Sequence, residues 1–164
     1  MATPSDSLGK AVAIARIGVG VLFVAFGQYK VFSPTFIHNG LRRSVENFVQ
    51  QNQAVGFYKV FLAKVVLPHA DAFGYVVGLG ELAIGLALIL GFLVRPASFF
   101  GALHMLSLIL ATFYVPGRDA PLWRYFAAQL EHVPLFFLFF IFLVGGAGEV
   151  WGLDALRVGK PKGA

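Results

Sequence analysis

Long runs of apolar residues, each about the length of a membrane-crossing helix, constrain this chain more than any other feature. They cover about residues 11–32, 72–94, 96–115 and 126–146. A helix needs about 20 predominantly apolar residues to cross the hydrocarbon core of a bilayer. Hydrophobic residues make up 58% of the chain and charged residues only 13%, which leaves no room for a soluble domain. The sequence therefore predicts an all-α integral membrane four-helix bundle in a single domain.

The connections between these runs differ in character. Over residues 34–67, Ile37, Leu41 and Val45 recur at helical spacing with charged residues between them. This pattern predicts an amphipathic helical segment between the first and second helices, in the membrane interface or over the mouth of the bundle. The link "VRPAS" is long enough only for a tight turn, so the second and third helices should form an antiparallel hairpin.

Polar residues inside the runs share helical faces with glycines. Arg16 and Lys30 belong to the first run, Glu81 to the second and His104 to the third. The expected inward faces carry Arg16, Gly20, Phe23, Gly27 and Lys30, then Gly74, Gly78, Glu81 and Gly85, then Gly101, His104 and Leu108. Small residues on a face indicate close packing against another helix, so these polar side chains should point into the bundle.

Glu81 is the most informative of these residues. An ionised carboxylate near the middle of a bilayer is costly unless it is paired, and Lys30, Arg16 and His104 are its candidate partners. We expect a Lys30–Glu81 interaction beside a cavity that opens towards the side of the first loop. A structural hydrogen bond between helices is the alternative for Glu81, and a packing role is the alternative for His104.

Several function classes are disfavoured. The chain has no cysteine, so thiolate metal sites and thiol nucleophiles are excluded. Its histidines do not stand three or four residues apart, and no metal site is expected. The net charge of +5 comes from cations scattered at helix ends, which suit lipid headgroups better than nucleic acid.

The orientation follows from the number of helices. An even number places both termini on the side of the turn at residue 95. The Lys and Arg residues of the two sides nearly balance, but short flanks weigh more than folded loops. We therefore expect cytoplasmic termini.

Three stretches resemble the DoxX-like membrane proteins. They are "ARIGVGVLFVAFGQYKVF", "GLGELAIGLALILGFLVRPAS" and "GAGEVWGLDAL", the last with Gly152 where the family has serine. The resemblance implies a four-helix bundle in a prokaryotic inner membrane, and relatives include a membrane subunit of thiosulfate:quinone oxidoreductase. It also implies that Arg16, Lys30, Glu81, Arg95 and Asp154 are family-type polar residues.

The leading hypothesis is a membrane subunit of a quinone-linked oxidoreductase. Glu81, Lys30 and His104, with Arg16 as a further candidate, would line a quinone or proton site. The lipid bilayer and other membrane subunits are the expected partners. The alternative is a non-catalytic assembly subunit of a larger membrane complex. A small-solute transporter has less support, because no run is interrupted by proline in its middle.

Overall fold

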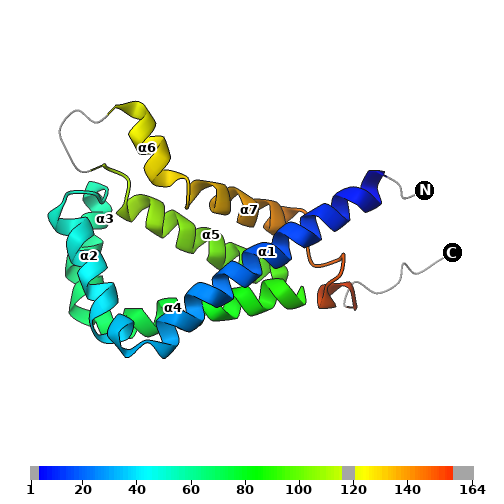
Figure 1. The fold of residues 1–164 in the computed structure, drawn as a ribbon, viewed down its shortest axis with the longest axis horizontal. Coiled ribbons are helices and arrows are strands. Elements are labelled where there is room, and N and C mark those ends of the chain that lie inside the picture. The colour runs from blue at the N-terminus through cyan, green and yellow to red at the C-terminus, as the bar shows by residue number, and fades with distance from the viewer. Residues whose placement is uncertain (1–3, 116–120, 157–164) are drawn as a thin grey trace.

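The computed structural model describes residues 4–115 and 121–156, and within these ranges every regular element is helical. Figure 1 shows the long helices α1, α4, α5 and α7 running along the molecule, with α2, α3 and α6 gathered at one end. The elements are α1 (Pro4–Phe32), η1 (Phe36–Gly40), α2 (Leu41–Gln50), α3 (Gly56–Phe61), η2 (Leu62–Val66), η3 (Leu67–His69), α4 (Ala70–Leu90), α5 (Val94–Ala111), α6 (Leu122–Gln129), α7 (Val133–Val144) and η4 (Leu153–Leu156).

Helices α1 and α4 pack closely along their glycine faces. A Cβ atom on Gly27 would lie 2.6 Å from the backbone nitrogen of Leu82, and one on Gly85 would lie 2.7 Å from that of Val24. Only glycine permits this approach of the two backbones. The inward faces predicted for these helices are confirmed, since Arg16, Phe23 and Glu81 are also buried.

The turn between α4 and α5 occupies residues 91–93, slightly earlier than expected. Helix α4 ends at Leu90 because Gly91 adopts a left-handed conformation with φ of 64°, as is common after a helix. Helix α5 already begins at Val94. Pro96 then lies in its first turn, where backbone N–H groups have no partner within the helix and proline is tolerated.

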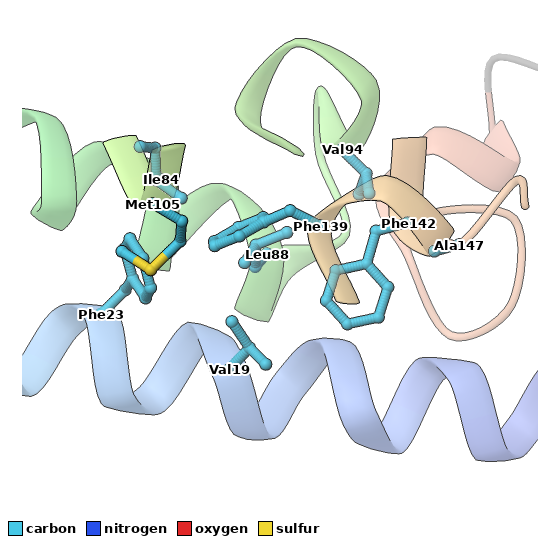
Figure 2. Close-up of a cluster of buried hydrophobic side chains, with 9 residues drawn as sticks. All are labelled: Val19, Phe23, Ile84, Leu88, Val94, Met105, Phe139, Phe142 and Ala147. Carbon is cyan, nitrogen blue, oxygen red and sulfur yellow. The ribbon is translucent and has the colours of Figure 1, made fainter. Parts of the chain in front are cut away.

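The main hydrophobic core lies near this turn. Phe139 and Phe142 of α7 have no exposed surface and pack with Leu88, Val94 and Met105. Figure 2 shows the two rings projecting from α7 between α1 and the α4–α5 hairpin. Helix α7 therefore holds the closed end of the hairpin together.

The second apolar helix is longer than the expected 72–94. Residues Gly56–Leu90 form a continuous stretch of 35 residues, in which the π-helical η2 and the 3₁₀ segment η3 precede α4. Pro68 cannot donate a backbone hydrogen bond, and these local changes of helix type accommodate it. Only α2 is therefore a separate helix within the expected amphipathic segment 34–67.

The fourth expected span, over 126–146, is not one continuous helix. Its place is taken by α6 and α7, which are bent by 51° at a short break. Pro134 lies at the start of α7, and its missing N–H prevents a continuous helix through residues 130–132. This break also corrects the expectation that no apolar run is interrupted. The described residues contain three helices long and apolar enough to cross a membrane, or four if the bent pair counts as one.

The α2–η2 segment covers the wide end of the hairpin, where α4 and α5 diverge (Figure 1). Val45, Leu62 and Val66 are buried there against Ala111 of α5. The backbone N–H of Val55 also donates to the Leu110 carbonyl at 3.0 Å. The segment is thus a packed cover and not a free loop.

Candidate functional site

Three polar side chains from three helices meet at Glu81. Lys30 Nζ, from the last turn of α1, lies 2.5 Å from Glu81 Oε1. His104 Nε2, from the middle of α5, lies 2.9 Å from the same oxygen. The Lys30–Glu81 contact predicted from the sequence is confirmed, and His104 joins it.

The environment of this cluster is largely apolar. The Glu81 side chain is 7% exposed, and those of Lys30 and His104 are 20% and 18% exposed. Phe23 packs edge-on against the His104 ring, with 6.4 Å between ring centroids. Low polarity strengthens interactions within the cluster and makes an unpaired charge there costly.

The two oxygens of the Glu81 carboxylate differ in their contacts. Both contacts of Glu81 are to Oε1, while Oε2 is buried without a hydrogen-bond partner among the described residues. A carboxylate has room for several donors. The cluster can therefore accept a further hydrogen bond at Glu81 Oε2.

A cavity of about 780 Å³ lies beside the cluster. This volume is within the usual range for small-molecule sites. The cluster provides the charged and imidazole groups of its lining, and most other lining residues are apolar side chains of α4, α5 and the α2–η2 cover. They include Val45, Leu62, Val66, Phe73, Val77, Ile84, Phe100, Leu103 and Leu110. The cavity fits a molecule with a large apolar part and one polar end.

The cavity lies away from the α4–α5 turn, at which α7 packs on the hairpin. There, Phe139 of α7 is so close to Gly101 of α5 that no Cβ would fit between them. Further from the turn the helices diverge (Figure 1), and the α2–η2 cover lies across the wide end. The hairpin predicted from the sequence therefore carries its candidate site at its open end.

A second polar contact lines the same cavity and has no counterpart among the sequence-based candidates. The Tyr58 hydroxyl of α3 is hydrogen-bonded to the Ser107 hydroxyl of α5. Ser107 lies one helical turn after His104, which could have marked it. The partner residue Tyr58 depends on how the cover folds, which the apolar spacing does not reveal.

The structure does not bring Arg16 to this cluster. Its side chain is fully buried near the α4–α5 turn, where Nη1 donates to the Leu88 carbonyl at 2.7 Å. Nη2 donates to the Trp151 carbonyl at 2.9 Å. Arg16 therefore fastens the chain at the opposite end of the bundle from Lys30.

The other two family-type residues also lie at the turn. Asp154 accepts hydrogen bonds from the backbone N–H groups of Leu93 and Val94, each at 2.9 Å. Arg95 and Asp154 line a smaller cavity of about 280 Å³. Within the described ranges, no group of three or more His, Cys, Asp or Glu side chains could hold a metal ion.

The fold and the comparisons with known proteins define a multi-pass helical membrane protein. The chain belongs to the DoxX family, whose model matches residues 11–116. That range contains Arg16, Lys30, Glu81 and His104, and it ends before α6. Neither the curated proteins nor the solved structures compared with the chain gave a match.

Proposed function

We propose that this chain is a small membrane subunit of a quinone-linked oxidoreductase and that its large cavity binds the quinone. The headgroup would lie at the Lys30–Glu81–His104 cluster, and the apolar walls would surround its tail. The buried Glu81 Oε2, which has no partner among the described residues and lies beside a large apolar cavity, carries this proposal.

The cluster has the donors and acceptors that such a headgroup needs. A quinone supplies two-electron, two-proton redox chemistry when bound, with the electrons delivered by a partner protein. The Lys30 ammonium donates to Glu81 and keeps further N–H donors for a carbonyl oxygen. Glu81 Oε2 can accept the O–H of a reduced ring, and His104 holds Oε1 in place.

Proton exchange with water would take place through Lys30. Its side chain is 20% exposed and belongs to the last turn of α1, whereas Glu81 lies in the middle of α4. A charged group near a helix end can reach the membrane interface. The Glu81 carboxylate would then be linked to the aqueous side without water filling the cavity.

The proposal also places the protein in a prokaryotic inner membrane with cytoplasmic termini and other membrane subunits as partners. If the bent α6–α7 pair crosses the bilayer once, the number of crossings is even. The N-terminal half of α1 and the C-terminal η4 then lie at the same end of the bundle (Figure 1). That arrangement supports a common side for both termini.

The test is quinone binding by the purified protein in nanodiscs. In Glu81→Gln, which keeps the shape of the side chain, the affinity for decylubiquinone should fall about tenfold or more, because a charged hydrogen-bond acceptor is lost. Glu131→Gln, which alters an exposed carboxylate outside the cavity, should bind like the wild type. Equal affinity in wild type and Glu81→Gln would contradict the proposal.

The assembly subunit remains the second candidate function, and the position of the cluster favours it. Glu81 joins α1, α4 and α5, so its contacts could serve packing alone. Glu81→Gln would then lower the melting temperature and release a partner in native mass spectrometry, while no quinone would be recovered from the wild type.

A further inference from the structure

The cavity has an opening between α4 and α5 that is separate from its polar cluster. We call this the lateral opening and define it by Val76, Gly80 and Ala83 of α4 with Phe100, Leu103 and Leu106 of α5. Val76, Phe100 and Leu103 line the cavity and are nevertheless 65%, 57% and 52% exposed. These side chains therefore border the cavity and the outer surface at once.

The surface around the lateral opening suits lipid. All six residues are apolar or glycine, and they lie near the middle of helices that are long and apolar enough to cross a membrane. Exposed apolar surface at that depth contacts hydrocarbon. The lateral opening therefore faces the bilayer interior.

Buried side chains of the α2–η2 cover line the other end of the cavity. Val45, Leu62 and Val66 are each no more than 5% exposed and pack on α5. The Tyr58–Ser107 hydrogen bond and the backbone bond from Tyr114 N–H to the Gln53 carbonyl, at 2.8 Å, fasten the cover. A bulky apolar molecule would have to break these contacts to enter there.

Gly80 keeps the lateral opening wide. It lies in the middle of α4, where glycine weakens a helix relative to alanine. A Cβ atom at Gly80 would meet nothing within 4 Å, whereas one at Gly27 or Gly85 would meet backbone atoms closer than 3.0 Å. Helix packing therefore explains Gly27 and Gly85 but does not explain Gly80.

We infer that the lateral opening at Gly80 admits a quinone directly from the bilayer and holds its tail. This inference rests on the proposed function and adds its route of access. The headgroup would reach Glu81 Oε2, which is buried within the same cavity, and the tail would extend between α4 and α5 into the lipid.

Two variants that narrow the lateral opening test this inference in nanodiscs. Gly80→Leu adds a side chain where space is free, and Ala83→Phe does so one turn further along the exposed edge. Both should lower the affinity for decylubiquinone about tenfold or more, because the added side chain would occupy the space in which the apolar tail is buried. Both should bind the tail-less ubiquinone headgroup within about twofold of the wild type.

Gly18→Leu is the matched control, since Gly18 is exposed on α1, also has nothing within 4 Å of a Cβ and does not line the cavity. It should bind both ligands like the wild type. Wild-type affinity for decylubiquinone in both lateral-opening variants would overturn the inference. An equal loss of affinity for both ligands in both variants would also overturn it, because the new side chains would then have filled the cavity itself.

Two results separate this inference from the proposed function. If the wild type binds neither ligand, the proposed function fails and the inference fails with it. If the wild type binds quinone but Gly80→Leu displaces only a co-purified phospholipid, in native mass spectrometry, the lateral opening holds an acyl chain. The inference then fails while the proposed function stands.

Discussion

Arg16 is fully buried and joins parts of the chain that are far apart in sequence. Its guanidinium donates to carbonyl oxygens of α4 and of the segment between α7 and η4. It also lies against Gly91, where a Cβ would collide with it. A charged donor shared between backbone carbonyls in a low-dielectric region is a strong structural contact.

Replacing Arg16 should destabilise the fold. In Arg16→Met the carbonyls of Leu88 and Trp151 lose their donors, and the free energy of unfolding should fall by about 3 kcal/mol. Arg16→Lys should recover only part of this loss, because one ammonium group cannot reach both carbonyls. Thermal unfolding in detergent measures the effect. An unchanged melting temperature in Arg16→Met, matching the exposed control Arg43→Met, would contradict this account.

The sequence predicted the side-chain contacts of Glu81 correctly, but it did not predict the contacts of Arg16 with backbone carbonyl groups. The Lys30–Glu81 contact followed from the cost of an unpaired carboxylate in a bilayer, and His104 followed from the hairpin. Arg16 was a further candidate for the site, because its carbonyl partners carry no signal in the residue types. Its separation from Lys30, about 21 Å along a helix at about 1.5 Å per residue, was the available sign that the two side chains lie at different depths.

At the scale of the elements, the start of α5 depends on a residue far along the chain. The two carboxylate oxygens of Asp154 accept from the Leu93 and Val94 N–H groups. The Asp154 N–H in turn donates to the Gly91 carbonyl at 2.8 Å. Asp154 therefore acts as a helix cap supplied from outside the helix.

Loss of this helix cap should lower the stability of the fold moderately. Asp154→Ala should lower the free energy of unfolding by about 1 kcal/mol, because two backbone donors lose their acceptor. Chemical unfolding in mixed micelles, compared with the exposed neighbour Glu149→Ala, measures the difference. If both variants have the same free energy of unfolding as the wild type, Asp154 does not stabilise the start of α5.

Element boundaries were predicted well where the cause was local and poorly where it was not. The α4–α5 turn was placed within a few residues, since a glycine and a proline flank it. The break between α6 and α7 was missed because an apolar run looks the same whether straight or bent by 51°. The extension of the second helix back to Gly56 was hidden by Pro68, which usually ends a helix.

At the scale of the whole molecule, the hairpin is fixed at one end and open at the other. Helix α7 packs the closed end, and the α2–η2 cover seals the open end around the cavity. The sequence indicated a cavity on the side of the first loop. Its size could not be predicted, because it depends on how far α4 and α5 diverge.

The cysteine-free chain makes its orientation directly measurable. Lys10, in the N-terminal part of α1, and Gln51, directly after α2, are exposed. Figure 1 shows the N-terminal part of α1 and helix α2 at opposite ends of the molecule. With cytoplasmic termini, a membrane-impermeant maleimide should label Gln51→Cys but not Lys10→Cys in intact bacterial cells. Both should react once the membrane is permeabilised. The reverse pattern in intact cells would place the termini outside.

The contacts of Arg16 also bear on how the protein is made. The ribosome delivers α1 to the membrane first, yet one acceptor of its buried guanidinium is the Trp151 carbonyl, 135 positions later. Until that segment is synthesised, α1 holds a cation without its final partners in or near the bilayer, which costs several kcal/mol. The first helix therefore becomes fully stable only after the segment around Trp151 has been synthesised, so that chains released before that point would be unstable.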